Sequence, residues 1–161
     1  MAETVSPLIL GIDPGSRKTG YGFIRRDGKQ LLPVAFGVVR PSPHMSFKDR
    51  ITEIFSEVRG LIELHHPVSM AMEDIFFAKN ASSALKLGHV RGAIMVAASL
   101  TETPLAEYSP THVKQAVTGR GRAQKHQVQQ MVKMLLGLES IPQEDAADAL
   151  AVAIAHAFEV Y

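Results

Sequence analysis

LILGIDPGSRKTGYGF, residues 8–23, is the segment around which the fold is built. An apolar run ends there at one carboxylate, and the chain then reverses direction. The run Leu8–Ile12 is almost continuously hydrophobic, which is typical of a strand covered on both faces. It ends at Asp13, and the Pro-Gly pair after it favours an extended aspartate followed by a tight reversal. A second strand is predicted from Thr19, where two glycines permit close approach by a neighbouring strand or by a phosphate. A plain hairpin with aspartate as an ordinary turn residue is the alternative.

The composition limits the class of protein. A chain of 161 residues has room for one domain with a substantial core, so residues 1–161 are predicted to form a single domain. No segment has the apolar length of a membrane span, and Met1–Ser6 lacks the charged start of a signal peptide. These features predict a cytoplasmic protein with no membrane partner. Cysteine is absent, which excludes disulfides and thiolate catalysis, so any metal must be held by oxygen or histidine.

The charges are unevenly distributed, although the formal net charge is only +1. Two long segments, between Asp74 and Glu102 and between Glu107 and Glu139, contain no acid. Their cations are Lys79, Lys86 and Arg91 in the first, and Lys114, Arg120, Arg122, Lys125 and Lys133 in the second. Ordinary solvated helix faces are one interpretation, but helices normally mix signs, so a polyanionic partner is favoured.

Alternation of apolar runs and helical periodicity predicts an α/β fold. Strands are expected at 8–12, 19–24, 31–39, 68–72 and 104–108, and helices at 47–65, 82–100, 110–117, 125–136 and after Ser140. Ser140 and Gln143 have capping-box spacing at the start of the last helix. The predicted architecture is a five-stranded mixed sheet flanked by helices, with strands 1–3 antiparallel and strands 1, 4 and 5 parallel.

Four acids are expected to converge at one edge of this sheet. The fourth strand, like the first, ends at a carboxylate, here Glu73, and parallel neighbours would place it close to Asp13. Asp145 and Asp148 share one face of the last helix. An acid in the first turn of a helix, such as Asp145, can simply complement the helix dipole, and an acid at a strand end, such as Glu73, is often only a surface group. Neither explanation fits Asp148, which lies beyond the first turn among apolar residues. The four carboxylates predict a site for Mg²⁺, or Mn²⁺ in its place, and two such ions suit phosphodiester hydrolysis.

Three further features point to contacts with partners. Apolar residues on more than one face of the helix at 82–100 predict self-association. The loop Thr118–Arg122 offers glycine backbone N–H groups beside Arg120 and Arg122, a predicted cradle for phosphate. Phe76 and Phe77 form an apolar pair in a predicted loop, where exposure would require a reason.

Five motifs cover nearly the whole chain in order: GIDPGSRKTGYG (11–22), ED (73–74), FFAKNASSALKLGHVRG (76–92), YSPTHVKQAVTGRGRAQK (108–125) and PQEDAADALAVAIAH (142–156). With them the chain resembles the RuvC-type Holliday junction endonucleases, whose fold is ribonuclease H-like. The resemblance implies a Mg²⁺-dependent enzyme that resolves four-way DNA junctions during recombination and repair. It also implies a homodimer, paired through the second helix, that nicks two strands symmetrically, and a branch-migration motor of the RuvA–RuvB type as partner.

The resemblance also assigns roles to single residues. The catalytic and metal-binding acids are Asp13, Glu73, Asp145 and Asp148, and the basic residues at the scissile region are Lys114 and Lys125. Phe76 is the aromatic residue that inserts at the junction, with Phe77 adjacent. Lys79, Arg120 and Arg122 are predicted as further DNA contacts.

Two other functions fit parts of the same pattern. The acid and glycines of residues 13–22 also resemble the phosphate loop of sugar kinase, Hsp70 and actin ATPases, but those proteins need two such domains. A junction-binding module that never cuts is the non-enzymatic alternative, and it leaves the acids unexplained beside phosphates. The histidines lack ligand spacing; His126, next to Lys125, is the one hypothesised to assist proton transfer.

Overall fold

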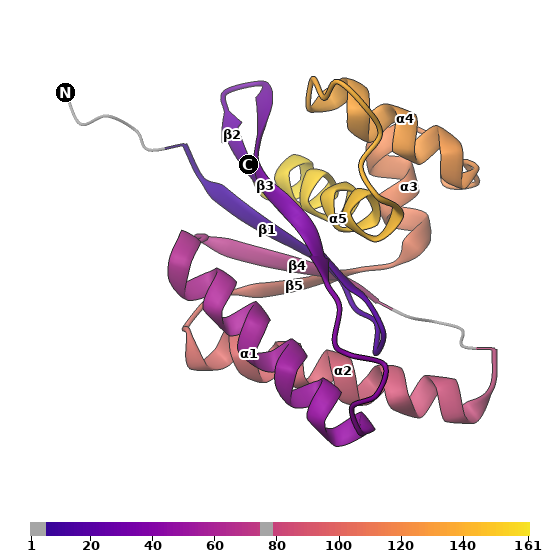
Figure 1. The fold of residues 1–161 in the computed structure, drawn as a ribbon. Coiled ribbons are helices and arrows are strands. Elements are labelled where there is room, and N and C mark those ends of the chain that lie inside the picture. Colours follow the sequence, from indigo (N-terminus) through magenta and orange to yellow (C-terminus); the bar gives the residue numbers. More distant parts are fainter. Residues whose placement is uncertain (1–5, 75–78) are drawn as a thin grey trace.

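The computed structural model describes residues 6–74 and 79–161 (Figure 1). The strands are β1 (Leu8–Asp13), β2 (Thr19–Asp27), β3 (Gln30–Val39), β4 (Ser69–Glu73) and β5 (Leu105–Tyr108). The helices are α1 (Phe47–His65), α2 (Ala81–Leu100), α3 (Pro110–Thr118), α4 (Lys125–Leu135) and α5 (Glu144–Val160). None of the helices in these described ranges is long and apolar enough to cross a membrane.

The strands form one mixed sheet in the order β3-β2-β1-β4-β5. β1 pairs antiparallel with β2, which pairs antiparallel with β3, while β4 lies parallel to both β1 and β5. This arrangement confirms the predicted α/β architecture. The crossover helices α1 and α2 lie on the same face of the sheet (Figure 1), as right-handed connections between parallel strands require.

The opposite face is covered by α5, with α3 and α4 outside it (Figure 1). Three glycines let α5 lie directly on β1 and β2. A Cβ atom on Gly11 would lie 2.0 Å from the carbonyl oxygen of Ala149, and one on Gly22 would lie 2.5 Å from Cδ2 of Leu150. At Gly20 the obstacle is the carbonyl oxygen of Asp145, at 1.9 Å. The prediction that the β2 glycines admit a strand or a phosphate is therefore wrong, because a helix backbone fills the space.

The sheet separates two apolar clusters. Ile9, Ile24 and Leu150 belong to the cluster on the α5 face, and Leu10, Phe23 and Ile54 to the cluster under α1 and α2. Alternate residues of β1 and β2 thus feed opposite clusters, which explains why the first strand is hydrophobic without alternation.

The two edges of the sheet are irregular or short. β3 contains Pro33, and its register with β2 shifts between Phe23 and Ile24. β5 at the other edge has four residues. Proline, a bulge and brevity are all features that limit pairing along a sheet edge.

The helix starts follow local capping chemistry, with one correction. Ser46 caps α1, as predicted, by accepting a hydrogen bond from the Asp49 N–H at 3.1 Å. The capping box predicted at Ser140 is wrong, since α5 begins only after Gln143. A helix starting at Ser140 would force Ile141, which precedes a proline, into the α region that such residues avoid.

Candidate active site

The ends of β1 and β4 bring the first two acids together. The two strands are parallel neighbours with Ile12 opposite Met72, so Asp13 and Glu73 follow at the same edge of the sheet. Both side chains are partly buried, whereas the residues before them are fully buried. The structure therefore places these two predicted acids side by side at the strand exits.

Helix α5 brings the other two acids to the same edge. Gly20, which pairs with Asp13 across β1 and β2, has the carbonyl of Asp145 directly above its Cα atom. Asp148 follows one turn later, with its side chain 27% exposed. The absence of a side chain at Gly20 thus fixes the height of α5 above this edge of the sheet, and with it the positions of both aspartates.

The four carboxylates interact electrostatically. Burial, together with the neighbouring charges of Asp148, Glu73 and Asp145, raises the pKa of Asp13 to about 8. Burial also raises the pKa of Glu73, as does the charge of Asp148. The pKa of Asp148 is raised mainly by burial, and its hydrogen bond from Lys125 opposes the rise. Such repulsion among partly buried acids is typical of functional sites and is relieved by a cation.

Two lysines flank the acids. Lys125 Nζ lies 3.1 Å from Asp148 Oδ2 and also contacts Glu144. Burial opposes the charge on Lys125, but the hydrogen bonds to Glu144 and Asp148 outweigh it and raise the pKa of this ammonium group. Lys114, from α3, lines a cavity of about 230 Å³ together with Glu73, Lys125 and Asp148. Two of the acids, Glu73 and Asp148, and both lysines thus line one hollow.

The acids are engaged by protein partners. Lys125 holds Asp148, and Gln143 Nε2 donates to Asp145 Oδ2 at 2.7 Å. Within residues 6–74 and 79–161, no three His, Cys, Asp or Glu side chains are grouped as metal ligands. The four predicted acids therefore interact through their charges but do not form a closed shell of metal ligands. Their donor atoms nevertheless suit a hard divalent cation, because all are carboxylate oxygens whose negative charges repel one another.

Arg91 is a structural residue of the site that the sequence did not identify. Its guanidinium, 11% exposed, donates to the Glu73 carbonyl oxygen and contacts the carboxylates of Glu107 and Asp74, the latter at 3.4 Å. It therefore fixes the end of β4 instead of serving as a free cation of the first basic segment. The acids that neutralise it lie far away in sequence, so charge counting along the chain could not find them.

The remaining predicted contacts are exposed or lie outside the described residues. Lys79, Arg120 and Arg122 are exposed. The loop after α3 is held by hydrogen bonds, among them one from the Arg120 N–H to Thr118 Oγ1 at 3.1 Å. Phe76 and Phe77 lie outside the described residues.

Two histidines differ in environment. His126 is exposed at the start of α4, and its hypothesised role in proton transfer stays a prediction. His156 is buried and bridges the Tyr108 hydroxyl, at 2.7 Å, to Ser69 Oγ, at 3.0 Å. Burial lowers the pKa of His156. It is a packed core residue, as predicted for a histidine without ligand spacing.

A mixed sheet of order 3-2-1-4-5, with acids at two strand ends and on the helix across them, defines the class of proteins with a ribonuclease H-like fold. A yeast mitochondrial Holliday junction resolvase shares this fold with a TM-score of 0.69 at 15% identity. Residues 9–156 match the family of the crossover junction endodeoxyribonuclease RuvC, and the chain belongs to this family. It is therefore an enzyme, and the predicted family, fold and nuclease class are confirmed.

Relatives are similar over most of their length. The RuvC protein of Citrifermentans bemidjiense is 53% identical over 93% of this chain and 92% of its own. That of Shewanella amazonensis is 52% identical over 92% of this chain and 86% of its own. The solved structure of T. thermophilus RuvC in complex with a Holliday junction substrate has a TM-score of 0.90 at 36% identity, covering 94% of this chain and 93% of that one.

Proposed function

We propose that this enzyme resolves four-way DNA junctions by hydrolysing one phosphodiester bond in each of two strands, during recombination and repair. The observation that carries the proposal is the set of four interacting acids at one sheet edge, two of which, Glu73 and Asp148, line a hollow with Lys114 and Lys125. Membership of the RuvC family supports the substrate, because the T. thermophilus relative was solved with a Holliday junction.

The acids are proposed to hold divalent cations. Asp13, Glu73, Asp145 and Asp148 would bind Mg²⁺, for which Mn²⁺ is a substitute, since both ions prefer carboxylate oxygen. A pair of such ions supplies an activated water and stabilises the leaving oxygen of a phosphodiester. The protein's part is to place the carboxylates on rigid elements, two at strand ends and two on α5.

The lysines are proposed to stabilise charge at the scissile phosphate. Lys114 and Lys125 stand on separate helices, α3 and α4, and both lower the pKa of Glu73. With DNA bound, Lys125 exchanges its contacts with Glu144 and Asp148 for a phosphate oxygen. An interaction that strengthens as charge develops accelerates cleavage more than it tightens binding.

Further DNA contacts are proposed on both sides of the hollow. Arg120, Arg122 and Lys79 would bind backbone phosphates, and their exposure leaves them accessible. Phe76, supported by Phe77, is proposed to insert at the crossover, because an apolar wedge can stack on a base and hold the junction open.

The proposed assembly is a homodimer paired through α2. Four apolar side chains of this helix are exposed: Leu85, Met95, Val96 and Leu100. Covering them in a symmetric pair gives two active sites for two strands. A branch-migration motor of the RuvA–RuvB type is the further proposed partner, and the cytoplasm the proposed location.

The test is cleavage of a labelled four-way junction in Mg²⁺, beside a linear duplex of the same arm sequence. We expect paired nicks in the junction and an intact duplex. Binding without cutting in Mg²⁺ or Mn²⁺ would favour the non-enzymatic alternative, and equal cutting of the duplex would remove the structural selectivity. Phe76→Ala should slow cutting and lower the signal of 2-aminopurine at the crossover while thermal stability stays unchanged; a destabilised variant with normal signal contradicts the wedge.

A further inference from the structure

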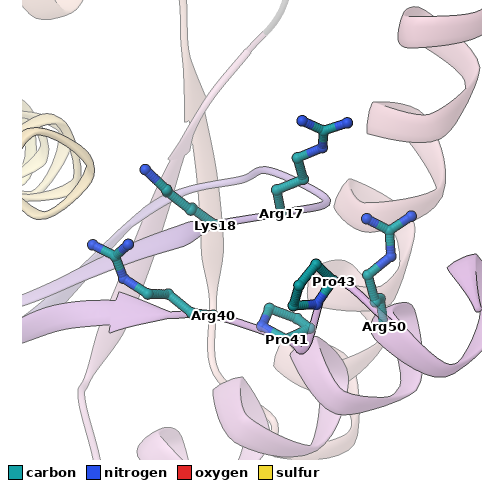
Figure 2. A pocket seen from close by; sticks show the side chains of 6 residues that line it. All are labelled: Arg17, Lys18, Arg40, Pro41, Pro43 and Arg50. Carbon is teal, nitrogen blue, oxygen red and sulfur yellow. The ribbon is translucent and has the colours of Figure 1, made fainter. Parts of the chain in front are cut away.

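A cavity lined by four cations lies beside the turn that follows Asp13. Arg17 and Lys18 from the turn between β1 and β2, Arg40 after β3, and Arg50 in the first turn of α1 surround about 530 Å³. Figure 2 shows the four side chains projecting to the same side above Pro41 and Pro43. A volume of this size is typical of ligand sites, and the lining contains no acceptor side chain.

The charge of this basic pocket (Arg17, Lys18, Arg40, Arg50) is not neutralised. Within residues 6–74 and 79–161, none of the four forms an ion pair. Asp49, the acid next to Arg50, is engaged by Lys48 at 3.6 Å and by the Ser46 hydroxyl at 2.8 Å. Four neighbouring cations repel one another, so the arrangement favours a bound anion.

Arg50 supplies an independent observation. Its Nε atom is buried and has no hydrogen-bond partner among the described residues, while its guanidinium lies 5.7 Å from the centre of the Phe47 ring. A buried donor without a partner is uncommon in a folded protein and destabilises it unless a ligand provides an acceptor. Guanidinium groups match the two oxygens of a phosphate.

The pocket continues toward α2. A second cavity, of about 380 Å³, shares Arg17 and Arg50 with the first and adds Lys86, Ser83 and the turn residues Gly15 and Ser16. Lys86 also has no ion pair in the part of the chain that the structure describes. Two joined cavities with five cations suit several phosphates along one strand better than a single small anion.

The pocket is close to the catalytic edge but on the other face of the sheet from Lys114 and Lys125. Arg17 is four positions after Asp13 in the sequence, so their Cα atoms lie at most about 14 Å apart. At ~3.4 Å of rise per nucleotide, this distance corresponds to no more than about four nucleotides of a B-form strand. The acids therefore lie between two cationic surfaces.

We propose that the basic pocket binds backbone phosphates of a junction strand within about four nucleotides of the bond that is cut, on the α1 and α2 side of the acids. This inference rests on the proposed function for its substrate. The shared chemistry is a phosphate anion, and free pyrophosphate is the competing source. The pocket positions DNA and takes no part in the chemical step.

The first experiment compares two variants with equal loss of charge. Arg17→Gln with Arg40→Gln removes two pocket cations, and Lys29→Gln with Arg59→Gln removes two cations elsewhere. Junction binding is measured without divalent metal over a range of salt. We expect the slope of log Kd against log salt to fall by about two for the pocket variant and to stay unchanged for the control. Equal slopes for the two variants overturn the proposal.

A second experiment locates the contact. A single methylphosphonate, which removes one backbone charge, is scanned from one to five nucleotides on each side of the cut bond. At a contacted position it should weaken wild-type binding roughly tenfold and leave binding by the pocket variant unchanged. Additive losses at every position contradict a direct contact.

Arg50 and free anions are tested separately. Arg50→Met removes the buried donor, so we expect an unchanged or higher Tm together with weaker junction binding. A lower Tm with unchanged binding makes Arg50 structural and overturns its assignment.

Pyrophosphate that binds wild type but not the pocket variant, while junction binding is equal in both, would assign the pocket to a free anion. Single-turnover cutting at saturating enzyme should be the same for the control variant as for wild type. Failure of wild type to cut a junction rejects the proposed function alone, because the binding slopes do not depend on it.

Discussion

Helices α5 and α2 are both rich in alanine and both lie against the sheet, yet they are used differently. α5 has 17 residues, of which eleven are buried, and it meets the backbone of β1 and β2 at glycines. α2 has 20 residues and buries only Val90, Ile94, Ala97 and Ala98. The difference shows that one face of the sheet fixes the acids with close backbone contact, while the other leaves apolar and cationic side chains for partners.

Lys125 and the cations of the basic pocket, which lie on different faces of the sheet, also differ in their ion pairing. On the α5 face, Lys125 is held by Glu144 and Asp148. On the other face, the cations of the basic pocket have no ion pair within the described residues. Lys125 on one face is thus paired with acids, whereas the basic pocket on the other face is not, in the part of the chain that the structure describes.

The largest expected effect is the loss of cleavage when an acid of α5 is replaced. Asp148→Asn should reduce single-turnover cleavage in Mg²⁺ at least about 100-fold while leaving junction affinity within about twofold, because it removes a proposed metal ligand and no DNA contact. Asp49→Asn, on α1, is the matched control and should cut normally. Cleavage by Asp148→Asn at near the wild-type rate would exclude this residue from the site.

The next effect concerns the glycines of β1 and β2 that lie against α5. Gly20→Ala should destabilise the protein by roughly 3 kcal/mol, since its methyl group would lie 1.9 Å from the Asp145 carbonyl oxygen. Gly60→Ala on α1 meets nothing within 4 Å and should stabilise by up to about 1 kcal/mol. Urea unfolding measures both. Equal stability of the two variants would show that α5 can shift without cost.

A smaller effect is expected at the uncovered face of α2. Val96 is 50% exposed, and Val96→Asp should weaken the proposed dimer about tenfold by placing a charge in an apolar interface. Leu64→Asp on α1, where the side chain is 72% exposed, should leave dimerisation unchanged. Sedimentation at several concentrations distinguishes them. Dissociation by Leu64→Asp alone would move the interface to α1.

The smallest effect is the pH dependence of stability without metal. The pKa of Asp13 is raised from 3.8 to about 8 on folding, so the folded state binds a proton that the unfolded state releases between these values. The stability contributed by this proton is complete below pH ~4 and is lost as pH rises through ~8.

Asp13→Asn should therefore raise the Tm of the metal-free protein at pH 8, by about 2–4 °C for each kcal/mol of unfavourable ionisation that it removes. At pH 4 it should have little effect. Glu57→Gln, on α1, should change neither value. A metal-free protein whose Tm rises steadily from pH 4 to 8 would contradict the repulsion among the acids.

The sequence was sufficient to predict the sheet and the converging strand ends. An apolar run that stops at an acid marks a buried strand and its exit, and a helical crossover makes β4 parallel to β1. These rules placed Asp13 and Glu73 together. The predicted start of α5 is wrong because Pro142 keeps Ile141 out of the α region, so the spacing of Ser140 and Gln143 does not form a capping box.

Other features depend on contacts that no local pattern contains. Gly20 predicts close approach but not that the approaching group is the backbone of Asp145. Arg91 reads as one more cation of a basic segment, and its acidic partners are visible only in three dimensions. The basic pocket collects cations from separate segments, each of them unremarkable alone.

The edges of the sheet also constrain how copies of this protein can join. A sheet with free edges can grow by adding a strand from another molecule, which leads to open-ended fibres. Here β3 carries Pro33 and a register shift, and β5 has only four residues. Strand addition is thereby discouraged on both sides, which is consistent with the proposed pairing through helices and lowers the risk of aggregation when the sheet edges are transiently exposed during folding.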